Sequence, residues 1–171
     1  LVKATIEQDL VDEEATKKHP QALEALKAAV AGLSLDEVAS QTGLTADALR
    51  EIASIFAEAP RSVVVCAEGV VRSARGYTNV LKLIDLAWIT GKLGRPGCGV
   101  NTVTEEPNEQ GAVDMGVAPE FLPGQARFDD SVIRARFAKA WDSSLPAAGT
   151  GSRLMDILNG CKNGTIKALY V

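Results

Sequence analysis

The sequence predicts an α/β fold: a parallel, Rossmann-like and doubly wound sheet with an α-helical N-terminal cover. Apolar residues recur at helical spacing before residue 60, a short β-branched run begins at Ser62, and helix-like and strand-like segments alternate after it. Strands that alternate with helices imply right-handed crossovers and parallel neighbours. We expect residues 1–171 to form a single domain, helical over 1–60 and α/β over 61–171.

Caps and spacing predict the N-terminal helices. The charged, alanine-rich residues Asp12 to Val30 fit one or two short helices. A capping-box pattern at Ser34 to Glu37 begins the next helix, which Gly43 ends. Thr45 to Ala59 then forms a longer amphipathic helix whose apolar residues share one face, so this helix packs against another element.

The α/β half begins with the β-branched run Ser62 to Cys66, which is typical of a buried parallel strand. The segment Thr78 to Leu93 is apolar nearly all round, which predicts a largely buried helix. Residues 94–125 are rich in glycine and proline and lack periodicity, which predicts a long loop. Within it, polar side chains and glycines favour a compact turn over Asn108 to Gly116, with a looser backbone over Thr102 to Pro107.

Two helices and a strand are predicted for the rest of the chain. One helix is expected near Ser131 to Trp141. Ser152 is expected to cap another helix, which stops at Gly160. The apolar run Thr165 to Val171 predicts a last strand.

Composition excludes several classes of partner. Of the 171 residues, 46% are hydrophobic, which is enough for a core. A net charge of −4 and a pI near 5.1 provide no basic surface for nucleic acid or anionic lipid. The longest apolar runs fall short of the roughly 20 residues that a membrane span requires. We therefore expect no nucleic-acid partner and no direct membrane insertion.

The cysteine and histidine content limits the chemistry. Cys66, Cys98 and Cys161 are widely separated and odd in number, which indicates a reducing compartment. His19 is the single histidine, so this chain alone cannot build a His/Cys metal cluster or a histidine-based nucleophile pair. We therefore assign no catalytic residue and no metal ligand, and both ends of the chain look cut.

An alternative from another functional class is a helix-turn-helix DNA-binding protein. Ser34 to Phe56 offers two short amphipathic helices joined by a glycine turn. Between Ser34 and Ala59, however, the single basic residue Arg50 stands against five acidic residues. Because this charge would repel phosphates, a helical hairpin that covers a sheet is the favoured interpretation.

The candidate binding edge follows from the predicted topology. Ligands of open parallel sheets sit outside the carboxyl ends of the strands, so we expect the loop after Cys66, and whatever follows Val171, to form the site. Arg72 and Arg75 in that loop could clamp a phosphate or a pterin, or be merely solvated. The glutamates of Glu105 to Glu109 could serve acid–base work, although carboxylates this close together are more typical of a hydrated loop.

Three strings carry a resemblance to a known family. Leu83 to Asn101 reads L-x-x-L-A-x-x-T-G-x-x-G-R-P-G-x-G-V-N, and Asn108 to Gln125 reads N-E-Q-G-A-x-D-M-G-x-x-P-x-x-L-P-G-x. With the ending I-K-A-L-Y-V, Ile166 to Val171, they resemble the molybdopterin oxidoreductase family over nearly the whole chain. Within that family the sequence is most similar to the member found in bacterial NADH–quinone oxidoreductase (complex I), with the formate dehydrogenase catalytic (alpha) subunit as a near relative.

The resemblance implies that the chain is a fragment of a larger, multi-domain oxidoreductase subunit and is inactive in isolation. It implies a domain that lines the cleft for a molybdopterin guanine dinucleotide, with iron–sulfur clusters only outside this fragment. The implied partners are the remaining domains of the same subunit and the other subunits of a respiratory or formate-oxidising complex. Such a complex would be cytoplasmic, at the periphery of the inner membrane. The implied cofactor contacts are Glu68, Gly69, Arg72, Glu106, Asn108, Gln110 and Gly111.

The chain departs from the family pattern at two places. Formate dehydrogenases carry R-G-Q-N-N-V-Q-G where Thr104 to Gly111 reads T-E-E-P-N-E-Q-G, and the pterin-facing loop, often M-G-x-x-Q, reads E-G-V-V-R over Glu68 to Arg72. Losing a cation and gaining two carboxylates disfavours an anionic substrate such as formate. Two interpretations stay open: the parent holds the cofactor and uses another substrate, or, as is typical of the complex I member, the domain keeps the fold without the cofactor. The second is favoured.

Overall fold

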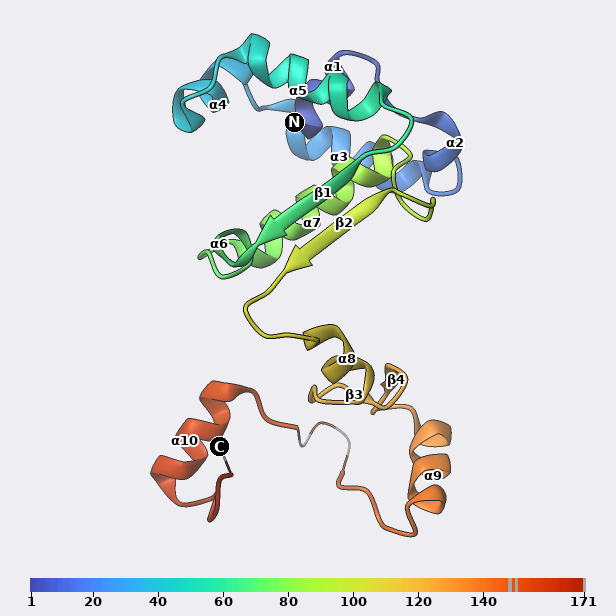
Figure 1. Ribbon diagram of the computed structural model, residues 1–171, viewed down its shortest axis with the longest axis vertical. Helices are drawn as coiled ribbons and strands as arrows, with labels where there is room; N and C mark the ends of the chain where they lie inside the picture. The colour runs from blue at the N-terminus through green and yellow to red at the C-terminus, as the bar shows by residue number, and fades with distance from the viewer. Residues whose placement is uncertain (148, 150, 171) are drawn as a thin grey trace. The chain divides into compact units, whose positions relative to one another are not determined.

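The computed structural model describes residues 1–147, 149 and 151–170. The chain divides into two compact units, Leu1–Glu105 and Glu106–Val171 (Figure 1). The first unit combines helices with a parallel strand pair, and the second combines helices with a short antiparallel pair. A mixed helix and strand fold with a small parallel sheet is therefore present, while the single domain over residues 1–171 stays a prediction.

The first part of unit 1 is helical, as the sequence predicts. Thr45 caps the longest of these helices by accepting a hydrogen bond from the Ala48 N–H at 3.1 Å. Gly43 ends the preceding helix in the left-handed conformation, with φ of 75°. The Ser34 side chain makes no capping hydrogen bond among the described residues, so the predicted capping box does not form. The helices are α1 (Val2–Glu7), α2 (Glu13–Thr16), α3 (Pro20–Ala31), α4 (Leu35–Thr42) and α5 (Ala46–Glu58).

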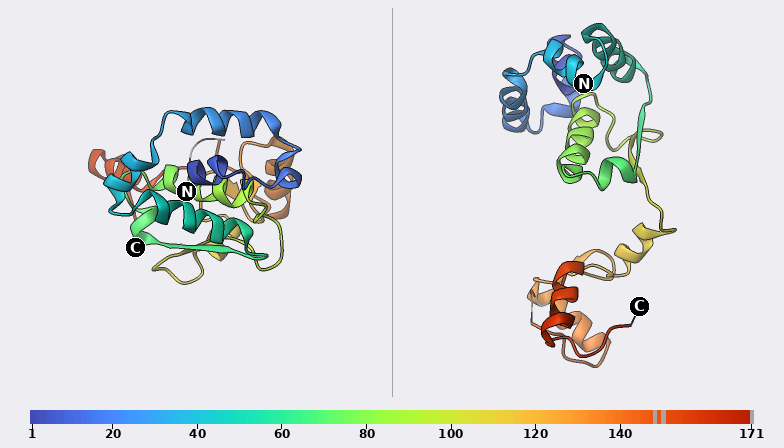
Figure 2. Two further views of the ribbon diagram at one scale, coloured as in Figure 1. Left: turned by 90° about the horizontal axis from the view of Figure 1, so that it is seen from above. Right: turned by 90° about the vertical axis from the view of Figure 1, so that its left-hand side faces the viewer.

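Two apolar clusters hold this helical part together. The first joins α1 and α3 to the helix α7 (Gly76–Ile89) through buried Val2, Leu26, Val30, Leu86 and Ile89. Figure 2 shows the result as layers, with α7 lying between α3 and the strand pair. The second cluster packs α4 and α5 around α1 and consists of Ala4, Leu35, Ala39, Leu49 and Ala53.

The parallel pair consists of β1 (Val63–Ala67) and β2 (Gly99–Val103), with Val63 beside Gly99 and Ala67 beside Val103. The prediction of the first strand is confirmed, but β2 falls inside the stretch predicted as a long loop, so that prediction is wrong there. Glycine and proline residues flank β2, so its sequence shows no clear strand pattern. Backbone pairing with β1 is what makes this segment a strand.

Only one face of this pair is covered within unit 1. Cys66 on β1 is buried, whereas Val65 is 65% and Val103 53% exposed on the other face. The N-terminal half of α7 is also open, with Tyr77 and Leu81 exposed. The prediction of a buried strand is therefore wrong for one face of β1, because a single helical layer covers the two-stranded sheet on one side only. The prediction of a largely buried helix is wrong for the N-terminal half of α7.

Asp12 connects the N-terminal helices to the end of α7. Its side chain caps α2 by accepting from the Ala15 N–H at 2.9 Å, and its backbone N–H donates to the Ile89 carbonyl at 2.7 Å. Arg95 Nη2 lies 3.4 Å from Asp12 Oδ2. Gly91, at φ of 68°, leaves room for this carboxylate, because a Cβ there would lie 2.2 Å from Oδ2.

Unit 2 contains α8 (Glu109–Asp114), the antiparallel pair β3 (Phe121–Leu122) and β4 (Ala126–Arg127), α9 (Ser131–Ala140) and α10 (Leu154–Asn163). The predicted helix near Ser131 is confirmed, and Asp130 caps it through the Val132 and Ile133 N–H groups. The compact turn predicted over Asn108 to Gly116 is a short helix.

The end of the chain differs from the prediction. Gly160 lies inside α10, which runs on to Asn163 and is followed by the C-cap Gly164. The missing Cβ of Gly160 leaves room for Ile166, whose Cδ1 would be 2.8 Å from such an atom. The Ile166 N–H bonds the Gly160 carbonyl at 3.0 Å, so the chain folds back on the helix. Residues 165–170 are therefore not a strand, and Val171 lies outside the described residues.

Candidate functional site

The candidate site lies at the carboxyl edge of the parallel pair in unit 1. Parallel register places Ala67 beside Val103, so the residues that follow the two strands emerge at the same edge. Glu68 follows β1 directly and begins the short helix α6 (Glu68–Val71), while Thr104 and Glu105 follow β2. The sequence predicts the binding site at this same edge.

Three charged side chains form a cluster at this edge, called here the Glu68 cluster: Glu68, Arg72 and Glu105. The Glu105 backbone N–H donates a hydrogen bond to Glu68 Oε1, with an N–O distance of 3.4 Å. The other oxygen of this carboxylate, Oε2, pairs with Arg72 Nε one helical turn along. Arg72 Nη1 lies 3.6 Å from Glu105 Oε2, so one guanidinium meets two carboxylates.

The three side chains differ in solvent exposure, and the less exposed contacts contribute more to the cluster. The Glu68 side chain is 20% exposed, against 64% for Arg72 and 71% for Glu105. Glu68 Oε2 itself is shielded from solvent and has no hydrogen-bond partner among the described residues, so Arg72 meets it as an ion pair only. The outer Arg72–Glu105 pair is screened by water and contributes little. Glu68 is thus the fixed member of a cluster whose formal charge is −1.

Two glycines flank the cluster with opposite requirements. Gly69 lies inside α6, and a Cβ at this position would meet open space. Gly76 opens α7 after the turn, and a Cβ there would lie 1.7 Å from the Val71 carbonyl oxygen. Glycine at position 76 therefore permits the close approach of α6 and α7, whereas Gly69 has no such packing role.

The other predicted cofactor residues, Glu106, Asn108, Gln110 and Gly111, belong to unit 2. Asn108 precedes α8 in the left-handed conformation, with φ of 62°. Its side chain lies over Gly111, where a Cβ would be 2.4 Å from Asn108 Oδ1. The structure thus brings the predicted residues together as two groups, one in each unit. Glu105 completes the first group, although its sequence context favours a hydrated loop. The run before it, Gly99 to Val103, carries no strand pattern in the sequence, so no local signal places Glu105 at this edge.

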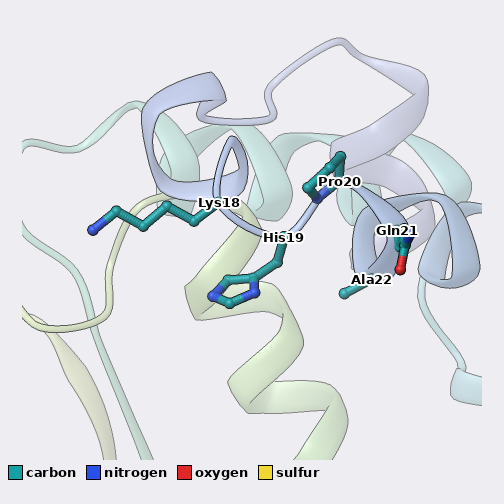
Figure 3. A pocket seen from close by; sticks show the side chains of 5 residues that line it. All are labelled: Lys18, His19, Pro20, Gln21 and Ala22. Carbon is teal, nitrogen blue, oxygen red and sulfur yellow. The ribbon is translucent and has the colours of Figure 1, made fainter.

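A hollow with a volume of about 410 Å³ lies at the start of α3. The residues that line it are all exposed, and Figure 3 shows the Lys18 and Gln21 side chains pointing in different directions rather than converging. Binding sites need polar groups that converge on a ligand. This hollow therefore provides no site, although it includes the chain's single histidine. Its lining residues are Lys18, His19, Pro20, Gln21 and Ala22.

Metal-binding and redox groups are sparse in the described part of the chain. Over residues 1–147, 149 and 151–170, no group of three or more His, Cys, Asp or Glu side chains is arranged to hold a metal ion. Cys66 is buried, Cys98 half-buried and Cys161 exposed, and all three are free thiols. In the same residues, no helix is long and apolar enough to span a membrane.

No protein-family model matches the chain. Individual relatives do: the chain is 33% identical to formate dehydrogenase H of Escherichia coli over 166 residues, 97% of this chain and 23% of that protein. It is 36% identical to the NADPH-Fe(3+) oxidoreductase subunit alpha of Geobacter sulfurreducens over 172 residues, which are 100% of this chain and 19% of that protein. It is 30% identical to the assimilatory nitrate reductase catalytic subunit of Bacillus subtilis over 175 residues, 100% of this chain and 24% of that protein.

The chain spans a quarter or less of the length of these curated relatives, yet each alignment covers nearly all of it. The relatives differ in the substrate that their names state and share the class of oxidoreductase alpha or catalytic subunits. The chain is therefore homologous to a segment of oxidoreductase alpha and catalytic subunits, formate dehydrogenases among them.

Proposed function

We propose that this chain is an internal domain of a molybdopterin-type oxidoreductase subunit, of the kind found in NADH–quinone oxidoreductase (complex I). In that subunit it supports electron transfer from NADH as a structural domain rather than as the cofactor's binding wall. The open, apolar face of the β1–β2 pair supports the further proposal that these strands belong to a larger, doubly wound sheet in the parent. The alignments over nearly the whole chain support the oxidoreductase class.

The Glu68 cluster is the observation that carries the structural role. A molybdopterin guanine dinucleotide bears phosphate groups, and a backbone N–H together with an arginine is a usual phosphate-binding pair. Here the Glu105 N–H and Arg72 Nε are both engaged by the Glu68 carboxylate. The residues at this edge therefore do not fit a phosphate group, and we derive no catalytic step through the cofactor.

A second candidate is the molybdopterin guanine dinucleotide-binding domain of a formate dehydrogenase-like enzyme. It is favoured by the identity with formate dehydrogenase H and by Asn108, Gln110 and Gly111, which keep the residues of the R-G-Q-N-N-V-Q-G pattern. The same pattern departs at its start, where Thr104 stands in place of the arginine and two glutamates follow. That departure removes the cation that would attract formate.

Elemental analysis of the full-length parent separates the two candidates. We expect the purified parent to contain no stoichiometric molybdenum and to show no formate-dependent dye reduction, with iron only from clusters held outside this segment. Formate dehydrogenase H, purified and assayed in the same way, provides the positive control. Stoichiometric molybdenum together with formate oxidation would establish the second candidate instead.

The proposed partners follow from the class of the parent. They are the remaining domains of the same polypeptide and the other subunits of a respiratory complex, as the name "subunit alpha" of two relatives is consistent with assembly. We propose a cytoplasmic position at the periphery of the inner membrane. Affinity purification of the parent with its complex, followed by identification of the co-purified subunits, tests this proposal.

A further inference from the structure

We propose that Glu68 is a built-in anion that sets the charge selectivity of the carboxyl edge, so that anionic ligands are rejected. This inference deepens the proposed function, on which its meaning for the parent rests. It assigns a specificity-determining role to one residue of the Glu68 cluster.

A backbone donor and a cation converge on the Glu68 carboxylate. One is the backbone N–H of Glu105, two residues after β2, which donates a hydrogen bond to Oε1, and the other is the guanidinium of Arg72, just after α6, which forms an ion pair with Oε2. Backbone N–H groups and guanidinium groups both bind carboxylate and phosphate oxygens in proteins. The carboxylate bridges them with one oxygen each, as an external carboxylate or phosphate would.

The position of Glu68 in the chain keeps its carboxylate on the Glu105 N–H and the Arg72 guanidinium. Glu68 is the first residue after β1, and Arg72 lies four residues further along the same short helical segment, where the two side chains share a face. The parallel register fixes the end of β2 beside them. An incoming anion therefore competes with a carboxylate that is already tethered to the site, which raises the effective concentration of the internal ligand.

Charge adds to this competition. With Glu68 ionised, the cluster carries two carboxylates and one guanidinium. Neutralising Glu68 as glutamine leaves a balanced Arg72 and Glu105, and it removes the negative charge that pairs with Arg72, while the glutamine amide oxygen can still accept the Glu105 N–H. The same change therefore frees the guanidinium and lowers repulsion, and both effects favour anion binding.

Anion titration of the 171-residue chain tests the proposal. Inorganic pyrophosphate is added to nitrogen-15-labelled protein, and the resonances of the Glu105 amide and the Arg72 Nε are followed. We expect Glu68→Gln to bind pyrophosphate at these nuclei at least about tenfold more tightly than the wild type. Adding Arg72→Gln to that variant should abolish the gain.

The matched control is Glu51→Gln, which removes the same charge from an exposed position on α5. It should bind pyrophosphate no better than the wild type. Equal binding by the wild type and Glu68→Gln would overturn the proposal, and so would an equal gain in the Glu51→Gln control, since that would reduce the effect to net charge.

A second measurement applies if Glu68→Gln does not fold. In Arg72→Gln alone, the Glu68 carboxylate loses its charged partner, so amide exchange of Glu105 should rise at least about threefold while exchange of Cys66 in β1 stays unchanged. Unchanged Glu105 exchange would overturn the proposal. A parent that contains molybdenum would refute the proposed function without affecting these results, and a failed titration would refute only the charge selectivity.

Discussion

The close approach at Gly76 predicts that Gly76→Ala destabilises unit 1. Ordinary van der Waals contact begins at 3.4 Å, whereas the new Cβ would stand 1.7 Å from the Val71 carbonyl oxygen and 2.5 Å from its carbon. Both atoms belong to the backbone, so no side chain can rotate away to relieve the clash. Either α6 or the first turn of α7 must move.

The magnitude follows from two opposing effects. Overpacking of this kind costs about 3 kcal/mol when backbone must shift. Alanine is the better helix former and recovers about 1 kcal/mol at the start of α7. We expect a net loss of about 2 kcal/mol in the free energy of unfolding. Because Val71 precedes Arg72, the shift should also weaken the Arg72–Glu68 contact.

Urea denaturation followed by tryptophan fluorescence measures this loss. Trp88 packs against the first apolar cluster in unit 1, so a Trp141→Phe background makes it the reporter. Gly69→Ala is the matched control: its Cβ meets open space, so the variant should be neutral or stabilised by up to about 1 kcal/mol. If the two variants lost equal stability, the reasoning from the Val71 contact would be refuted.

Three further predictions concern the core, a turn and a surface ion pair. Leu49→Ala in the second cluster should cost about 3 kcal/mol in urea denaturation, whereas Ile55→Ala, at a site 64% exposed, should stay within about 0.5 kcal/mol. Asn108→Gly should be tolerated at its positive φ, but Asn108→Ala should lower the thermal midpoint; equal midpoints would contradict the strain argument. Hydrogen bonds from Arg127 hold the pKa of Asp129 below its ordinary value in the folded protein. The pair therefore stabilises the folded state at pH above the pKa of Asp129 in the unfolded chain, and this stabilisation is lost as pH falls through the lower pKa of the folded state. Carbon-13 NMR titration should show the Asp129 pKa rising in Arg127→Gln, and no rise would contradict this origin.

The helices were predictable because their signals are local. Thr45 and Gly43 act through neighbours a few residues away, and the structure places the cap and the helix end at these residues. Gly160 gives the opposite case. Its sequence context indicates a helix end, but the side chain of Ile166 packs where a Cβ would stand, so the glycine serves close packing inside α10.

The strand β2 and the Glu68 cluster depend on contacts between distant residues. Gly99–Val103 forms a strand because β1 pairs with it, and its sequence has no alternation of apolar and polar residues that would predict a strand. Glu68 and Arg72 could be paired from their spacing of four, but the Glu105 N–H joins them only once the two strands are in register. The edge and several of its residues were therefore predictable, whereas the contacts that bind them together were not.

Asp12 shows how one residue can make two distant segments cooperative. Its carboxylate caps α2, meets Arg95 and fits because Gly91 has no side chain, while its backbone N–H bonds the end of α7. Opening either segment breaks the contacts of the other, so neither gains the freedom of a separate loop. In native-state exchange, the amides of Ala15 and Asp12 should consequently open with one shared free energy, as members of a single folding unit rather than as an N-terminal arm that frays by itself.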